Sequence, residues 1–329
     1  MEVPMKIRVL SASDIVQALF MADAIDVNAQ AYTMFSAGEV KMPQRLSIET
    51  AQGVTLFMPA YLPSTGALAV KAISIYNENP KKGLPTVHAM VLVLDNETGR
   101  PLALMDGTRL TALRTGAGAG AATRLLARED SRVLAMFGAG GLAMDQVEAV
   151  LSVRPINEVR IYTPSGSSAR NLAKRLSQQH SNLIARAVDS PAQAVHGADI
   201  ISCITTSRTP VFDPADVAPG THINGIGSFM PDVREVQVVG LPNLRVFVDS
   251  KEAALEEAGD LIQAIAEGCI QPEDLTEIGK VVLGKAPGRT SPDEITFFKS
   301  VGLAVQDVAT AQAVLARAME MGLGIEMEI

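Results

Sequence analysis

The chain has 329 residues, of which 47% are hydrophobic and 19% are charged, and its net charge is −8. This length and composition predict a globular protein with room for two cores, and they exclude an intrinsically disordered chain. No dense cluster of Lys and Arg accompanies the acidic balance, so a nucleic-acid-binding face is excluded as well.

The cysteines, the histidines and the apolar runs restrict the class of protein further. Cys203 and Cys269 stand far apart, without a CxxC or zinc spacing, which predicts reduced thiols and a cytoplasmic protein. The 4 histidines are scattered, so no metal site is expected. Glu2 and Pro4 interrupt the first segment, and no uncharged run reaches the roughly 18 residues of a membrane span, so neither a signal peptide nor a membrane helix is expected.

The first third of the chain reads as one helix followed by several strands. A strand is predicted over Lys6–Leu10, followed by a helix that Ser13 caps and that runs to about Ser36. Further strands are predicted at residues 44–49, 54–61, 66–76, 86–94 and 101–106. This order indicates a sheet-based α/β domain.

The most informative stretch follows a predicted helix, rich in Ala and Gly, over residues 108–127. An apolar strand, Val133–Phe137, runs into Gly138-Ala-Gly-Gly-Leu-Ala143, and a helix is predicted to continue to about Val153. In this G-x-G-x-x-A pattern the first glycine allows a tight turn, the second lets the backbone approach a pyrophosphate, and the alanine lets helix and strand pack closely. The expected cofactor contacts are Gly138, Ala139, Gly140, Gly141 and Leu142. A plain tight turn is the alternative.

From residue 131 to about 300, predicted strands and helices alternate. The strands are residues 159–162, 184–188, 200–205, 222–225 and 246–249, and the helices are residues 167–180, 191–196, 251–259 and 261–268. This alternation predicts a Rossmann-type doubly wound parallel sheet. A last helix is predicted over residues 295–321, packing back on the first domain. We therefore expect two domains, 1–118 with 304–329 and 119–303.

The loop after the second strand of the Rossmann-type domain bears on the cofactor. Sites that prefer NAD usually carry Asp or Glu there, about 20 residues after the glycines. Here Tyr162 is followed by Thr163-Pro-Ser-Gly-Ser-Ser, without a carboxylate that would repel a 2′-phosphate. Thr163, Ser165 and Arg170 are candidate contacts, so the expected cofactor is NADPH or NADH. A polar loop that serves either cofactor is the plainer interpretation.

Arg45, Lys71 and Arg114 are cations within apolar patterns of the first domain. Such residues are usually solvated at a surface. A lysine between Val70 and Ala72 in a sheet, however, is costly unless an anion pairs with it. Arginine prefers planar carboxylate or phosphate partners. These three residues are therefore candidates for binding an anionic substrate.

Longer motifs carry a family resemblance. They are Pro43-Gln-Arg45, Met58-Pro-Ala-Tyr61, Val70-Lys-Ala-Ile-Ser-Ile-Tyr-Asn-Glu-Asn-Pro80, Gly83-Leu-Pro-Thr-Val-His88, Asp106-Gly-Thr108, Thr111-Ala-Leu-Arg-Thr-Gly116, Gly225-Ile-Gly-Ser-Phe-Met-Pro-Asp-Val-Arg-Glu235 and Phe298-Lys-Ser-Val-Gly-Leu-Ala304. With these motifs and the Gly138 turn, the chain resembles the ornithine cyclodeaminase/μ-crystallin family nearly end to end. The resemblance implies a homodimer built through a substrate-binding first domain, with the active site between the two domains.

The resemblance also implies roles for single residues. In that family, the positions of Arg45, Lys71 and Arg114 surround the substrate carboxylate and the reacting carbon, which makes them the catalytic candidates. Met58, Phe229 and Ser300 join them as substrate-binding candidates. The further cofactor-binding candidates are Thr86, Arg114, Thr205, Thr206, Gly227 and Ser228.

One departure from the family pattern bears on the reaction. Cyclodeaminases and archaeal alanine dehydrogenase carry an Asp two residues before the Pro of the Gly…Pro…Glu motif, where this chain has Phe229. The pattern here resembles the branch that reduces cyclic ketimines, including Δ1-pyrroline-2-carboxylate reductases. The expected reaction is the NAD(P)H-dependent reduction of Δ1-pyrroline-2-carboxylate to L-proline, or of Δ1-piperideine-2-carboxylate to L-pipecolate.

Several alternatives stay open at this point. One is an ornithine cyclodeaminase or alanine dehydrogenase, and another is a non-catalytic NADP-dependent binding protein of the μ-crystallin type. The proton for the imine nitrogen could come from solvent or from a relay involving Lys71, and Lys71 could instead serve only as a partner of the substrate carboxylate. Asp232, which follows Pro231, could be catalytic or could cap a helix.

Overall fold

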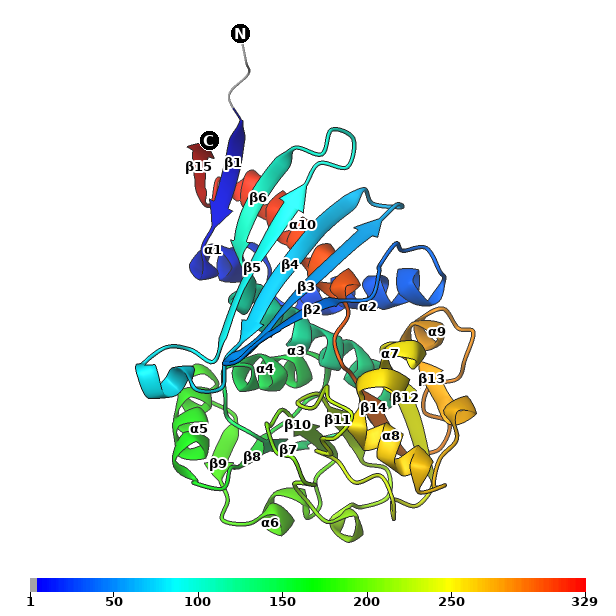
Figure 1. Ribbon diagram of the computed structural model, residues 1–329. Helices are drawn as coiled ribbons and strands as arrows, with labels where there is room; N and C mark the ends of the chain where they lie inside the picture. Colours follow the sequence, from blue (N-terminus) through cyan, green and yellow to red (C-terminus); the bar gives the residue numbers. More distant parts are fainter. Residues whose placement is uncertain (1–4) are drawn as a thin grey trace. The chain divides into compact units, whose positions relative to one another are not determined.

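The chain forms two compact units. The computed structural model describes residues 5–329 (Figure 1), so Glu2 and Pro4, which bear on the signal-peptide prediction, lie outside the described residues. Unit 1 comprises Met1–Arg114 with Leu303–Ile329, and unit 2 comprises Thr115–Gly302. The boundary at Arg114 falls within the long helix α3 (Gly107–Leu126).

Unit 1 is built on a seven-stranded mixed sheet. Its strands are β1 (Lys6–Leu10), β2 (Leu46–Thr50), β3 (Gly53–Leu62), β4 (Ala67–Ile75), β5 (Val87–Leu94), β6 (Pro101–Asp106) and β15 (Ile325–Glu328). Their order is β15-β1-β6-β5-β4-β3-β2, and every neighbouring pair is antiparallel except β1 with β6. The strands predicted between residues 44 and 106 are confirmed to within two residues at each end.

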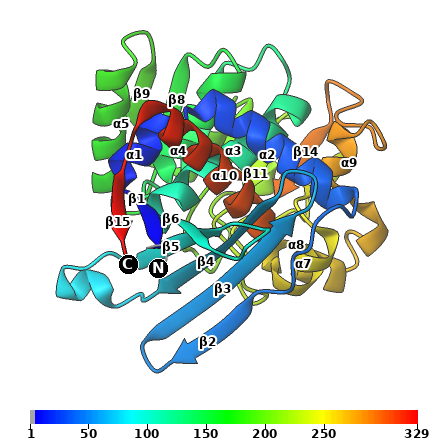
Figure 2. The ribbon, with the colours of Figure 1, turned by 90° about the horizontal axis from the view of Figure 1, so that it is seen from above.

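Helices cover one face of this sheet. Helix α2 (Met21–Ser36) and helix α10 (Ala304–Met321) pack on each other, and α10 lies across β3, β4 and β5 (Figure 2). Alternate residues of these strands, among them Ala60, Ala69 and Val93, are buried on the helix side. This is the period-2 pattern of a strand with one covered face.

The helix predicted over residues 13–36 is wrong in its start and its continuity. Ser11, not Ser13, caps α1 (Ala12–Ala18): its Oγ accepts the Asp14 N–H at 3.3 Å, and the Asp14 carboxylate accepts the Ser11 N–H at 2.8 Å. This reciprocal capping box fixes the helix start. The two residues after α1 have extended backbone, so α2 begins as a separate helix.

Unit 2 is built on an eight-stranded sheet whose neighbouring pairs are all parallel. Its strands are β7 (Val133–Phe137), β8 (Glu158–Tyr162), β9 (Ile184–Ala187), β10 (Ile200–Cys203), β11 (His222–Gly225), β12 (Leu244–Val248), β13 (Leu275–Glu277) and β14 (Ile295–Lys299). Its helices besides α3 are α4 (Ala143–Val153), α5 (Ser167–Gln179), α6 (Pro191–Val195), α7 (Lys251–Glu257), α8 (Gly259–Ala266) and α9 (Ile278–Val282). The strand order is β13-β12-β14-β11-β10-β7-β8-β9.

This sheet has an apolar core on each face. Leu134 and Met136 of β7 belong to one core cluster, whereas Ala135 and Phe137 belong to the other. The predicted Rossmann-type, doubly wound sheet is therefore confirmed. The chain runs outward from β7 through β8 and β9 on one side, and through β10 and β11 on the other. Ligands of such sheets bind beyond the carboxyl ends of the strands at this reversal, between β7 and β10.

The helix predicted over residues 295–321 is wrong in its first part. Ile295–Lys299 is β14, which lies between β12 and β11 with all five residues buried. A strand buried on both faces shows no alternation, so its apolar run resembles the start of a helix. Helix α10 begins only at Ala304. Strands β13 and β15 and helix α9 are absent from the predicted elements.

Candidate active site

The glycine turn after β7 has the geometry of a phosphate-binding turn. Gly138 has a φ of 95°, and a Cβ there would lie 2.5 Å from the Ile204 carbonyl oxygen, so glycine is required. At Gly140 and Gly141 a Cβ would meet no atom within 4 Å, so the space over the turn is open. Helix α4 follows, and no side chain caps its first N–H groups. The turn therefore fits the pyrophosphate of a dinucleotide.

The loop after β8 carries hydroxyl groups and an arginine. Thr163 is buried and accepts a hydrogen bond from Ser168 Oγ at 3.2 Å, whereas Ser165 and Arg170 are exposed. Gly166 turns the chain with a φ of 67°, and a Cβ there would lie 2.9 Å from Arg170 Nη1. The guanidinium thus folds back over the loop. Both a ribose hydroxyl and a 2′-phosphate can bind to such donors.

Glu235 joins the loops that follow β10 and β11. Its Oε1 accepts the Thr205 N–H at 2.5 Å, and its Oε2 accepts the Gly227 N–H at 2.8 Å. Gly227 has no room for a side chain, because a Cβ would lie 2.3 Å from the Thr205 carbonyl oxygen. The predicted cofactor residues Thr205, Thr206, Gly227 and Ser228 therefore stand on two adjoining loops at the carboxyl edge of the sheet.

Lys71 lies at the centre of β4 in unit 1 and is 1% exposed. Its cross-strand neighbours are Met58 on β3 and Val91 on β5. Its side chain lies on the face that α10 covers, where Nζ is 2.7 Å from Oδ2 of Asp307. The two side chains form a buried ion pair, since each is 1% exposed. Lys71 is thus a buried cation and not a solvated surface residue.

Arg114 of α3 binds the same carboxylate. Its Nε donates to Asp307 Oδ1 at 2.9 Å, and its Nη1 donates to Gln306 Oε1 at 3.3 Å. Gln306 is held in turn by Tyr32, whose Oη accepts its amide N–H at 2.9 Å. Lys71 and Arg114 therefore share one buried carboxylate. The excess positive charge suits a carboxylate anion as a further ligand.

The surroundings of Lys71 change its proton affinity. Burial is the main cause that lowers the pKa of Lys71 to about 7. The charges of Arg114 and Arg45 also lower this pKa, whereas Asp307 raises it. Lys71 and Arg114 therefore lie together on Asp307, while Arg45, half-buried before β2, acts on Lys71 through its charge. A lysine with this pKa can hold or release a proton near neutral pH.

Three further predicted substrate or cofactor residues, Ser300, Phe229 and Thr86, lie outside the cluster around Lys71. Ser300, beyond β14, donates its hydroxyl hydrogen bond to Asp249 Oδ2 at 2.7 Å. Phe229 is half-buried and packs against one apolar core cluster of unit 2. Thr86 is half-buried immediately before β5.

Sequence reasoning missed the carboxylates that organise these groups. Asp307 lies within the apolar helical pattern of α10. A carboxylate at such a buried position needs a charged partner, and this need was the signal in the sequence that could have identified it. Glu235 is the last residue of the Gly…Pro…Glu motif, but no role was predicted for it from the sequence. Asp232, whose role was open, forms an exposed ion pair with Arg208.

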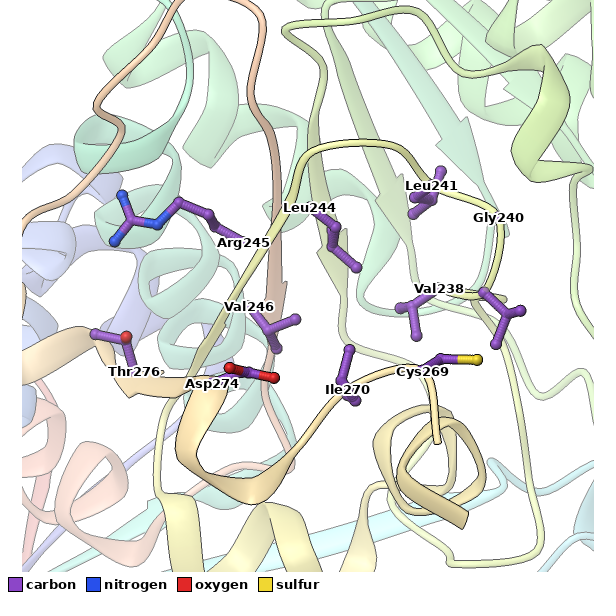
Figure 3. A pocket seen from close by; sticks show the side chains of 11 residues that line it. Val238, Gly240, Leu241, Leu244, Arg245, Val246, Cys269, Ile270, Asp274 and Thr276 are labelled. Carbon is purple, nitrogen blue, oxygen red and sulfur yellow. The ribbon is translucent and has the colours of Figure 1, made fainter. Parts of the chain in front are cut away.

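A separate hollow of about 470 Å³ lies beside β12 and β13 in unit 2 (Figure 3). Apolar residues of segment 238–241 and the side chains of Leu244, Val246 and Ile270 line it. Arg245 points out of it and donates to the Pro287 carbonyl oxygen at 3.1 Å. Three strands, β14, β11 and β10, separate β12 from β7. The hollow contains none of the predicted site residues.

Two kinds of feature are absent from residues 5–329. No three His, Cys, Asp or Glu side chains gather there as metal ligands would. No helix of that range has both the length and the apolarity that crossing a lipid bilayer requires.

A glycine turn at the reversal of a parallel sheet is typical of a dinucleotide-binding domain, and unit 1 separately contains a buried lysine of lowered pKa. The chain belongs to the ornithine cyclodeaminase/mu-crystallin family, whose sequence model matches residues 5–322. The predicted family resemblance is thus confirmed. The chain is 38% identical to a Delta(1)-pyrroline-2-carboxylate reductase of Bacillus cereus, over 97% of this chain and 99% of that one.

Solved structures resemble the chain over its whole length. One is the Delta(1)-pyrroline-2-carboxylate reductase of Thermococcus litoralis in complex with NADH and L-proline. It has a TM-score of 0.93 and 40% identity, with 97% of this chain and 99% of that chain covered. Another is an archaeal alanine dehydrogenase dimer with bound NAD, with a TM-score of 0.92, 34% identity, and 99% and 100% of the two chains covered.

Proposed function

We propose that this protein is an NAD(P)H-dependent ketimine reductase that converts Δ1-pyrroline-2-carboxylate to L-proline. The observation that carries the proposal is the buried cluster of Lys71, Arg114 and Asp307, which combines a carboxylate-binding charge with a lysine that titrates near pH 7. Similarity to Delta(1)-pyrroline-2-carboxylate reductases at 38% and 40% identity supports this substrate. The six-membered homologue, Δ1-piperideine-2-carboxylate, has the same reacting groups. Imine-dependent oxidation of the reduced cofactor is the test.

Arg45 and Arg114 are proposed to bind the carboxylate that stands beside the C=N bond of the substrate. A guanidinium group holds a carboxylate through paired N–H donors and thereby fixes its plane. Asp307 and Gln306 already orient Arg114, so little reorganisation is needed on binding. Met58, the buried cross-strand neighbour of Lys71, is proposed to contact the apolar ring. Such fixed geometry can supply several kcal/mol of the reaction barrier.

Lys71 is proposed to donate the proton that the imine nitrogen requires. A bound nicotinamide dinucleotide supplies the hydride to the imine carbon. Hydride and proton together convert C=N to CH–NH. The pKa of about 7 makes the Lys71 ammonium a stronger acid than an ordinary lysine. A substrate carboxylate beside Lys71 raises this pKa, because negative charge stabilises the ammonium. Lys71 is therefore protonated when the substrate is bound.

The cofactor is proposed to lie along the carboxyl edge of the unit 2 sheet. The open turn at Gly140 and the uncapped start of α4 would hold its pyrophosphate. The loops that carry Thr205 and Gly227 would hold the nicotinamide half. The loop after β8 accepts the adenosine ribose of NADH and the 2′-phosphate of NADPH, because it offers donors and no carboxylate.

Arg170→Ala is expected to raise the KM for NADPH about tenfold and to leave the KM for NADH within about twofold. A charge-assisted hydrogen bond to the 2′-phosphate contributes roughly 1.5 kcal/mol. Steady-state kinetics with each cofactor measure the two values. Arg175→Ala, which removes another exposed arginine of α5, is the control. Equal changes in both KM values would mean that Arg170 does not contact the 2′-phosphate.

We also propose a homodimer formed through the uncovered face of the unit 1 sheet. Leu46, Phe57, Ala72 and Met90 are paired across β2, β3, β4 and β5, on the face opposite Lys71. Leu46 and Met90 are 60% and 45% exposed in the single chain. An apolar sheet face of this kind usually marks an interface. The dimer of the archaeal alanine dehydrogenase agrees with the proposal.

Met90→Lys is expected to convert the dimer to a monomer at micromolar concentration. A charge placed among apolar side chains would lose its hydration at the interface. Size-exclusion chromatography with light scattering measures the mass. Met319→Lys introduces the same charge at an exposed methionine of α10, on the other side of the sheet, and should leave the dimer intact. A Met90→Lys protein that remains dimeric would exclude this face as the interface.

A further inference from the structure

A fully buried network of charges lies beneath the carboxyl edge of the unit 2 sheet. Lys299, the last residue of β14, has its Nζ 2.8 Å from Oδ2 of Asp260 in α8, and neither side chain is exposed. Ser228 lies between them. Lys299 donates to its carbonyl oxygen at 2.7 Å and to its Oγ at 2.6 Å. Ser228 Oγ donates to Asp260 Oδ2 at 2.5 Å, so the hydroxyl is engaged in the interior.

Glu235 extends this network to the loop after β10. Asp260 Oδ1 accepts the backbone N–H groups of Glu235 and Val236 at 2.7 and 2.6 Å. The Glu235 carboxylate in turn accepts the N–H groups of Thr205 and Gly227. One continuous set of contacts therefore links the ends of three neighbouring strands, β14, β11 and β10.

At the amino edge of the same sheet, neighbouring strand ends are connected by hydrogen bonds without a buried network of charges. There Asp199, at the start of β10, accepts the N–H groups of Arg132 and Val133 at the start of β7, at 2.8 and 3.0 Å. Asp199 is 18% exposed and pairs with the partly exposed Arg128. At the carboxyl edge, by contrast, three charged side chains are completely buried. Buried charges are costly compared with apolar packing, so their placement below the two loops points to a function of those loops.

We propose that Lys299, Asp260 and Glu235 are positioning residues that set the backbone of the Thr205 and Gly227 loops for the nicotinamide half of the cofactor. They act through the loops and do not touch the cofactor. Because Glu235 accepts the N–H groups of both Thr205 and Gly227, it fixes the backbone of the two loops relative to each other. The inference rests on the proposed nicotinamide cofactor, but it does not depend on which imine is reduced.

Glu235→Gln tests the proposal with little change in side-chain size. Gln has one acceptor oxygen, and its amide N–H groups cannot accept the second backbone N–H. We expect the Kd for NADH to rise at least tenfold in a fluorescence titration, at a temperature where circular dichroism shows the variant to be folded. Ser228→Ala keeps the Lys299–Asp260 ion pair and is expected to raise the Kd three- to tenfold.

Asp199→Asn is the matched control, because it weakens the corresponding contacts between strand ends at the amino edge of the sheet. It is expected to lower the thermal midpoint and to leave the Kd for NADH unchanged. If Glu235→Gln and Ser228→Ala also lower the midpoint without changing the Kd, the network is merely structural and the proposal is overturned. If Glu235→Gln fails to fold, Ser228→Ala decides alone.

The outcome for the wild-type protein separates this inference from the proposed function. Wild-type protein that binds NADH without reducing an imine contradicts the reductase, while the Kd comparison still decides the role of the network. Wild-type protein that binds neither NADH nor NADPH overturns both.

Discussion

Lys71→Met is expected to lower kcat for imine reduction by roughly 10²- to 10³-fold, within the range that a positioned general acid contributes. Methionine fills a similar volume without a proton to donate, and Arg114 still pairs with Asp307. The Kd for NADH should stay within about twofold, because the glycine turn and the loops after β8, β10 and β11, which are proposed to hold the cofactor, belong to unit 2. Steady-state kinetics at pH 7 and a fluorescence titration with NADH measure the two quantities. A kcat within twofold of the wild type would assign the proton to solvent.

The pH profile gives a second measurement on the same residue. Because the pKa of Lys71 is lowered to about 7, its ammonium is lost as the pH rises through that value, and kcat/KM should fall on the alkaline side. The imine nitrogen of the substrate also titrates. Lys71→Arg is therefore the reference, since its guanidinium stays charged and only the substrate titration remains. Identical profiles for the two proteins would show that Lys71 does not control the alkaline limb.

Asp307→Asn is expected to move the alkaline fall of kcat/KM about one to three pH units lower. Asp307 raises the pKa of Lys71, so its loss lowers that pKa and leaves the amine neutral at pH 7. Activity at pH 7.5 should fall about tenfold or more and should recover in part in acidic buffer. The pH dependence of kcat/KM, measured between about pH 5 and pH 9, tests this shift.

The control for this variant is Asp23→Asn, which removes an exposed carboxylate from α2 and should leave the profile unchanged. A loss of activity by the same factor at every pH would contradict a role of Asp307 in setting the proton affinity of Lys71. In that case Asp307 only holds Arg114 and the packing of α10.

The sequence predicted those parts of the fold whose signals are local. The strand β7, its glycine turn and α4 follow one another within about 20 residues, and each has its own pattern of apolar or small residues. The strands β3 to β6 were predictable because one face of their sheet is covered and the other is not, which produces alternation. Strand β14 has no such contrast, because both of its faces are buried, and its apolar run merged with that of α10.

The partners of the site residues were not predictable, because they come from distant parts of the chain. Lys71 was identified as a cation in an apolar strand, but nothing near it in sequence indicates Asp307 as its counter-ion. Lys299 and Asp260 were likewise not identified, since β14 was assigned to a helix and the contact of α8 with it depends on the sheet order. Tertiary packing decides such pairs, and a local pattern does not encode them.

Cofactor oxidation with Δ1-pyrroline-2-carboxylate as substrate tests the proposed reaction most directly. NADH or NADPH is mixed with the imine and the wild-type protein, and a parallel mixture of ornithine or alanine with NAD⁺ is assayed for ammonia. We expect imine-dependent oxidation of the cofactor with L-proline as the product, and no ammonia in the parallel mixture. Ammonia release without imine reduction would contradict the ketimine reductase and indicate a cyclodeaminase or an alanine dehydrogenase. Cofactor binding without turnover of any of these substrates would indicate a binding protein.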